Sequence, residues 1–238
     1  MNALIEYPIP HWISLFFMVA IPLPFILIAR LIKKTEKETG IKNMFLVSML
    51  FFICYLSYIL FASFNGWFKV VSLPPRVLLL ATFPYAFFLF GYLDKTKILN
   101  DIVNKVSIES LVQLHVFRVL GIFFLLLAFH DALPKPFALI AGFGDIITAI
   151  SSFFVVKSIQ DKKSYAAKLC LYWNFFGAAD IAFIAIAANV LTKISIDTGA
   201  MGVDSLAMFP FCIIPAFAPP TILFIHWMIY KKLKKQTQ

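Results

Sequence analysis

The segment PFALIAGFGDIITAISSFFVV, residues 136–156, decides the fold class because it is a nearly unbroken apolar run. A helix that crosses a bilayer needs about 20 predominantly apolar residues, since each residue advances the helix by about 1.5 Å. One charged residue, Asp145, stands close to the middle of this run. The segment therefore predicts a transmembrane helix that carries an acidic side chain deep in the membrane.

The composition of the whole chain extends this prediction to a membrane protein. Hydrophobic residues make up 61% of the sequence and charged residues 14%, and the mean hydropathy is +0.89. Soluble domains are about half apolar and about a quarter charged. Seven spans are predicted, at residues 10–32, 44–64, 74–93, 112–131, 136–156, 168–191 and 208–230. We therefore expect an all-α, polytopic membrane helical bundle that forms a single transmembrane domain over residues 1–238.

The lysines predict the orientation of this bundle. They gather in residues 33–43, 94–111 and 157–168 and in the tail after residue 230, which all belong to one side. By the positive-inside rule, the N-terminus lies outside and the C-terminus in the cytoplasm. We expect a multi-pass protein of the plasma membrane, specifically a bacterial inner membrane. The net charge of +9 then reflects contact with lipid headgroups, so the expected partner is the bilayer and not nucleic acid.

Polar residues inside the spans are concentrated in the second half of the chain. Arg118, Asp145, Asn174 and Asp180 lie in three consecutive predicted spans. A charge in the bilayer is costly and usually finds a partner inside the bundle. Both aspartates lie 12 residues from a flanking lysine, which places them at matching depth. We predict a buried cluster of these four residues that shares one proton, because two close carboxylates in a low dielectric cannot both stay ionised without a cation. An ion pair that only holds helices together is the alternative.

Small residues and prolines support the cluster. Gly142 and Gly144 precede Asp145, and Gly177 precedes Asp180 at the same spacing as Gly142, which predicts close helix packing beside each acid. The last span contains Pro210, Pro215, Pro219 and Pro220. Each interior proline removes a backbone hydrogen bond, so we expect this helix to be kinked or broken near its middle, either as a mobile wall of the site or as a static kink.

The histidines resemble a haem-binding arrangement. His115 and His226 lie near the predicted inner boundary and His11 and His130 near the outer one, similar to the stacked bis-histidine haems of membrane b-type cytochromes. The resemblance implies haem b as a cofactor. Each histidine also suits an interfacial side chain, so we expect no cofactor, with haem b as the alternative.

Catalytic motifs are scarce. The tetrapeptide Gly142 to Asp145 resembles the GxGD signature of intramembrane aspartyl proteases, which implies a catalytic role for Asp145. The preceding span offers only Asp131 at its outer edge as a partner, however, and the later Pro-Ala-Leu motif of that family reads Pro215-Ala216-Phe217. The sequence contains no P-loop, HExxH or GxSxG motif and no lysine in the last span for retinal, so it favours a protein that is not an enzyme without deciding the question, and we expect no metal site.

A broader resemblance covers spans four to six. The series is Arg118, Leu133-Pro134, Phe137-Ala138, Gly142-x-Gly144-Asp145, Trp173-Asn174, Gly177 and Asp180. It is similar to a pattern in uncharacterised multi-pass inner-membrane proteins of bacteria, and it implies no particular activity. The leading hypothesis is binding or proton-linked transport of a small solute, with a haem-bearing redox protein and an accessory subunit without ligand as alternatives. The sequence does not specify the solute or the oligomeric state.

Overall fold

The structure, a computed structural model, describes residues 7–236, and the regular elements in that part of the chain are helices. In order they are α1 (His11–Ala20), α2 (Pro22–Thr39), α3 (Met44–Phe64), η1 (Leu78–Thr82), α4 (Phe83–Ala86), η2 (Phe87–Tyr92), η3 (Leu93–Lys95), α5 (Lys97–Lys105), α6 (Ile108–Leu114), η4 (His115–Gly121), α7 (Ile122–Phe129), α8 (Lys135–Gln160), α9 (Ala166–Thr198), η5 (Asp204–Ala207) and α10 (Ile213–Gln236). The all-α class is confirmed.

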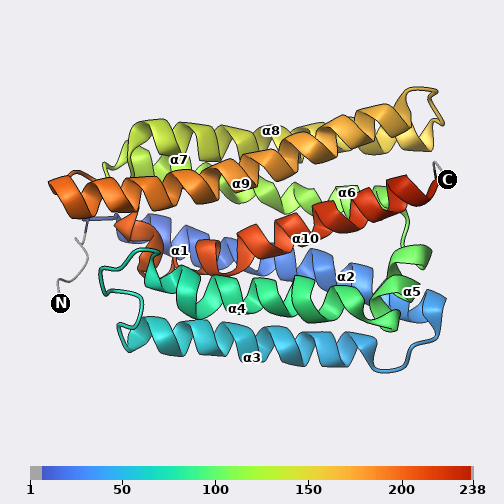
Figure 1. The fold of residues 1–238 in the computed structure, drawn as a ribbon, viewed down its shortest axis with the longest axis horizontal. Coiled ribbons are helices and arrows are strands. Elements are labelled where there is room, and N and C mark those ends of the chain that lie inside the picture. Colours follow the sequence, from blue (N-terminus) through green and yellow to red (C-terminus); the bar gives the residue numbers. More distant parts are fainter. Residues whose placement is uncertain (1–6, 237–238) are drawn as a thin grey trace.

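Six helical segments within residues 7–236 are long and apolar enough to cross a membrane, and they run side by side along the long axis of the molecule (Figure 1). They are His11–Thr39, Met44–Phe64, Ile108–Phe129, Lys135–Gln160, Ala166–Thr198 and Ile213–Lys235. Large apolar side chains point outward from them, as at Phe64, Phe129 and Phe175, which are 71%, 79% and 74% exposed. Apolar surface of this extent fits a membrane-embedded protein.

The predicted span at residues 74–93 is helical from residue 76, but it is irregular and is not one of the six. Two π-helical stretches, η1 and η2, flank the single turn of α4. Pro84 has no N–H to donate, so the carbonyl of Leu80 loses its usual helical partner. The hydroxyl of Tyr58 on α3 donates to this carbonyl instead, at 2.9 Å. The count of seven spans stays a prediction.

Pro219 and Pro220 lie beyond the first turn of α10 without breaking it, so the predicted break near the middle of the last span is wrong, while a kink there stays a prediction. The chain departs from regular helix earlier, at residues 208–212, before α10 begins. Pro219 and Pro220 release the carbonyls of Pro215 and Ala216, four residues before each. Thr82 Oγ1 donates to the Pro215 carbonyl at 2.7 Å, and the hydroxyl of Tyr55 donates to the Ala216 carbonyl at 2.9 Å. These bonds explain how the helix continues through both prolines.

Thr82→Val is expected to lower the free energy of unfolding by about 1–3 kcal/mol, because it leaves the Pro215 carbonyl buried without a donor. The midpoint of thermal unfolding in detergent measures this effect. Thr198→Val is the matched control, since Thr198 is exposed and donates only within its own helix, to the Ile194 carbonyl at 2.7 Å. Equal midpoints for the two variants would show that the bond from Thr82 does not stabilise α10.

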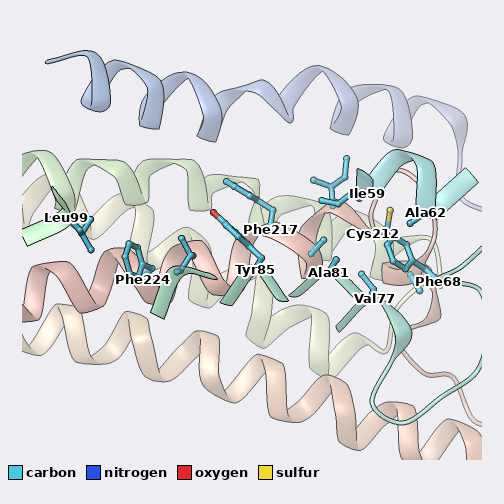
Figure 2. Close-up of a cluster of buried hydrophobic side chains, with 14 of the residues drawn as sticks. Ile59, Ala62, Phe68, Val77, Ala81, Tyr85, Leu99, Cys212, Phe217 and Phe224 are labelled. Atoms are coloured by element: carbon cyan, nitrogen blue, oxygen red, sulfur yellow. The ribbon is translucent and has the colours of Figure 1, made fainter. Parts of the chain in front are cut away.

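A buried apolar cluster packs α3 and the segment around α4 against α10 (Figure 2). Ile59 and Ala62 come from α3, Ala81 from η1, and Phe217 and Phe224 from α10. A second apolar cluster joins α6, α8, α9 and α10. The interior of this second group of helices contains the polar residues.

The lysine-rich segments all lie at one end of the bundle. The connections from α2 to α3 and from α8 to α9, the helix α5 and the end of α10 share the end marked C in Figure 1, and α1 begins at the opposite end. The structure thus separates the basic connections from the less basic ones, as the positive-inside rule requires. The side of the membrane on which each end lies stays a prediction.

Candidate functional site

Arg118 reaches the centre of the site from a stretch of 3₁₀ helix. The segment η4 (His115–Gly121) joins α6 to α7, and it packs along α8. Residues three apart lie one above the other in a 3₁₀ helix, so His115 and Arg118 point to the same side. Both are buried, at 0% and 1% exposure. The local change of helix type therefore presents two polar side chains to one interior space.

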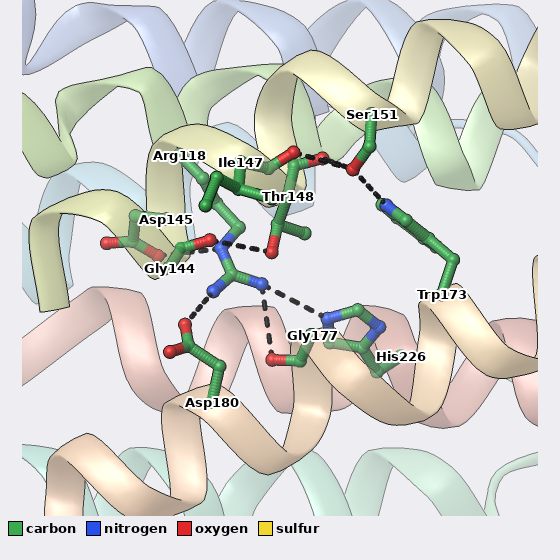
Figure 3. A network of polar contacts seen from close by, with 10 residues as sticks. All are labelled: Arg118, Gly144, Asp145, Ile147, Thr148, Ser151, Trp173, Gly177, Asp180 and His226. Atoms are coloured by element: carbon green, nitrogen blue, oxygen red, sulfur yellow. Dashed lines mark hydrogen bonds and ion pairs between the residues drawn. The ribbon is translucent and has the colours of Figure 1, made fainter. Parts of the chain in front are cut away.

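The guanidinium of Arg118 joins both aspartates (Figure 3). Its Nε donates to Asp145 Oδ1 at 2.7 Å and its Nη2 donates to Asp180 Oδ2 at 2.6 Å. Its Nη1 donates to the backbone carbonyl of Gly177 at 3.2 Å. The two carboxylate side chains are only 11% and 8% exposed. The predicted ion-pair cluster of Arg118, Asp145 and Asp180 is thus present inside the bundle.

Asn174 joins this cluster through a histidine and not through Arg118. Nε2 of His226 lies 3.4 Å from Arg118 Nη1, and Nδ1 of the same ring lies 2.9 Å from Asn174 Oδ1. Asn174 Nδ2 also donates to the backbone carbonyl of His226, at 3.1 Å. Sequence reasoning missed His226 as a member of the cluster, although it is the one ionisable residue between Ile213 and Tyr230 of α10.

His115 completes the polar interior without a hydrogen bond. Its ring lies 4.1 Å from the ring of His226, centroid to centroid, and contacts Trp173 edge-on at 5.1 Å. Neither ring nitrogen has a partner within the described part of the chain. Both histidines are buried, so the interfacial location considered for them is wrong.

The contact between the rings of His115 and His226 bears on the haem hypothesis. Rings in direct contact leave no space for a porphyrin between His115 and His226, so in this arrangement the pair does not fit a haem. The other two histidines lie away from the site. His11 begins α1, and the ring of His130, just after α7, lies 6.1 Å from that of Trp12. Haem b stays a prediction of the sequence alone.

The predicted glycines lie where any larger residue would collide with the cluster or with the segment that carries it. A Cβ atom at Gly144 would lie 2.6 Å from Cγ of Asp180, and one at Gly177 would lie 2.7 Å from Nε2 of His226. A Cβ at Gly142 would lie 3.0 Å from the carbonyl oxygen of Gly121. Gly121 was missed, although it follows Arg118 by three residues and therefore shares its face. Gly144 lets α8 and α9 approach each other, and Gly121 and Gly142 let η4 and α8 do so, which brings both carboxylates to one guanidinium.

A small cavity of about 60 Å³ touches the cluster at Arg118 and Asp145 and is otherwise lined by apolar residues. It is large enough for a few water molecules.

The prolines expected to support the site, Pro215, Pro219 and Pro220, lie elsewhere. The carbonyls of Pro215 and Ala216, which Pro219 and Pro220 release, point toward η1 and α3. The structure therefore separates the proline region from the ion pairs.

The charges of the three central groups do not balance. Arg118 supplies one positive charge, and Asp145 and Asp180 supply two negative charges when both are ionised, which leaves one negative charge inside the bundle. An isolated charge in this environment is costly. The site can therefore hold one proton on its carboxylates.

Comparison with known proteins identifies the family of this chain. No curated protein and no solved structure matches it. The model of a family described as a domain of unknown function, DUF8737, matches residues 74–234. This region contains every residue of the cluster and leaves α1, α2 and α3 outside. Because the match covers more than half of the chain, the protein belongs to the DUF8737 family.

Proposed function

We propose that this membrane protein binds and exchanges a proton at Arg118, Asp145 and Asp180 and couples it to the binding or passage of a small solute. The observation that carries the proposal is the pairing of two buried carboxylates with one guanidinium. A single proton cancels the excess negative charge and lets both ion-pair contacts persist. A permanent cation such as arginine keeps its own charge throughout, so the exchangeable proton belongs to the carboxylates.

The cavity beside Arg118 has space for water next to Asp145 and limits what else can bind there. Its volume of about 60 Å³ suits a short chain of water molecules, which can carry a proton, but is too small for a typical ligand. Passage of a solute therefore requires a second conformation. We assign the movement to α10, because Pro219 and Pro220 leave it two intrahelical hydrogen bonds short.

Infrared spectroscopy of the reconstituted protein is expected to show the carbonyl stretch of a protonated carboxylic acid. Asp145→Asn and Asp180→Asn are each expected to abolish this band, because either change balances the remaining carboxylate against Arg118. Both variants are expected to stay folded for the same reason. The matched control is Asp197→Asn on α9, whose carboxylate is 49% exposed and pairs with Lys193; it is expected to leave the band unchanged.

If the carbonyl band is absent, or if it stays unchanged in both Asp145→Asn and Asp180→Asn, the result contradicts the proton site. The accessory-subunit hypothesis predicts this outcome, with the cluster only fixing helix packing. Proton uptake in vesicles, followed by a dye inside them, then tests the coupling: Asp180→Asn is expected to lose any uptake that a solute induces in the unsubstituted protein.

We further propose seven spans, with the N-terminus outside and the C-terminus in the cytoplasm of a bacterial inner membrane. The helical run at residues 76–95 supports the additional span, because its 20 residues equal the length that a bilayer requires. The lysines at the C-terminal end of the bundle support the orientation.

A further inference from the structure

We propose that a second cavity, lined by α2, α3, α5, α6, α10 and the segment around α4, binds one acyl chain of an anionic phospholipid. Its volume is about 520 Å³, within the range of ligand pockets, and we call it the acyl-chain cavity. Along α3 its wall extends from Met44 to Phe52, about 12 Å at the helical rise. The cavity is thus long as well as large. It is separate from the proton site, and the inference does not depend on the proposed function.

The chemistry of the wall selects a hydrocarbon occupant. Leu89, Leu111 and Phe224 line the cavity at 6%, 2% and 6% exposure. The polar atoms at its deep end are the hydroxyls of Tyr85 and Thr221, which lie 3.1 Å apart and bond to each other. Most of the wall is apolar, so water inside would find few partners, and protein interiors seldom contain empty spaces much larger than a water molecule. A flexible hydrocarbon chain needs no polar partner and fills the space.

The cavity reaches the surface beside α3 and α5, toward the lysine-rich end of the bundle. Its wall includes Val47 on α3, Tyr92 on η2 and Ile98 on α5, which are 63%, 63% and 54% exposed. These residues mark an opening between α3 and the segments that follow α4. An acyl chain can therefore enter sideways from the bilayer without crossing water.

Charge at one end of the cavity identifies the headgroup. Lys42, in the connection from α2 to α3, lines the cavity and is exposed. It stands at the lysine-rich end of the bundle, where a headgroup is expected if the tail lies between the helices. A positive charge beside an apolar slot suits an anionic head on a hydrocarbon tail. It favours a phospholipid such as phosphatidylglycerol over an uncharged isoprenoid.

Photocrosslinking of the full chain tests this inference. The protein is reconstituted in phosphatidylcholine vesicles that contain a trace of phosphatidylglycerol with a diazirine on its acyl chain, and adducts are located by mass spectrometry. We expect adducts on Leu89 and Leu111, which lipids around the bundle do not reach because both are buried. Ser48→Trp, which fills the cavity, is expected to reduce them several-fold. The control is Leu46→Trp, since Leu46 is 56% exposed and does not line the cavity.

Selectivity for the headgroup is tested with a phosphatidylcholine probe that carries the same chain, and with Lys42→Glu. Both are expected to give several-fold fewer adducts on Leu89 and Leu111; equal labelling in both cases would overturn the anionic assignment. Adducts confined to exposed residues such as Leu50, or an isoprenoid recovered from the cavity, would overturn the proposal. None of these changes touches Arg118 or the aspartates, so the infrared band reports on the proton site separately.

Discussion

Arg118→Leu is expected to destabilise the protein by about 3–5 kcal/mol, because it removes the one cation that faces two buried carboxylates. For a chain of this size the midpoint of thermal unfolding is expected to fall by roughly 10 °C. The deficit is expected to shrink at low pH, since a protonated carboxyl carries no charge. Thermal unfolding in detergent at several pH values measures both effects.

A triple variant separates the cost of unpaired charge from the cost of lost packing. Replacing Arg118, Asp145 and Asp180 together by leucine removes the cluster without leaving a charge behind. Buried ion pairs replaced by apolar residues often leave stability unchanged or raise it. We expect the triple variant to recover most of the stability lost in Arg118→Leu. A triple variant as unstable as the single one would mean that the cluster is a structural requirement of the bundle.

Gly144→Ala is expected to have the second large effect. The added methyl group would lie 2.6 Å from Cγ of Asp180 and force this carboxylate away from Arg118. We expect a loss of about 2–4 kcal/mol, since overpacking and a broken ion pair outweigh the gain of about 1 kcal/mol in helix propensity. The infrared band should change as well, because the two carboxylates no longer share one guanidinium.

Two further variants make this prediction specific. In the background Asp180→Ala the carboxylate is gone, so Gly144→Ala is expected to cost little, and the difference measures the coupling between the two positions. Gly91→Ala is the matched control, because the nearest atoms belong to the exposed ring of Phe87, 3.1 Å from the added carbon, which is free to turn aside. A similar loss in all backgrounds would place the defect in the helix and not in the ion pair.

Much of the fold followed from the sequence because membrane helices obey simple rules. Length and apolarity predicted residues 44–64 and 136–156 nearly as they occur in α3 and α8. The helix α2 ends at Thr39 and α9 at Thr198, beyond the predicted ends at residues 32 and 191. The prediction follows apolarity, which stops at the first polar residues, whereas a helix can continue through them. The irregular helix after residue 76 was not predictable, because the partner of the carbonyl that Pro84 releases, the Tyr58 hydroxyl, comes from the separate helix α3.

The sequence alone also determined that Arg118, Asp145 and Asp180 are costly in a membrane and must find partners, since no other interior cation was available to the acids. Only the tertiary structure decided which atoms meet, because rotation of each helix is set by packing at Gly121, Gly144 and Gly177. The same holds for His226, whose place beside Arg118 depends on how α10 packs against α9. The prolines of α10 show this most clearly. The sequence identifies which residues lack an N–H group, but whether the helix breaks depends on hydroxyls of distant residues, which donate to the released carbonyls.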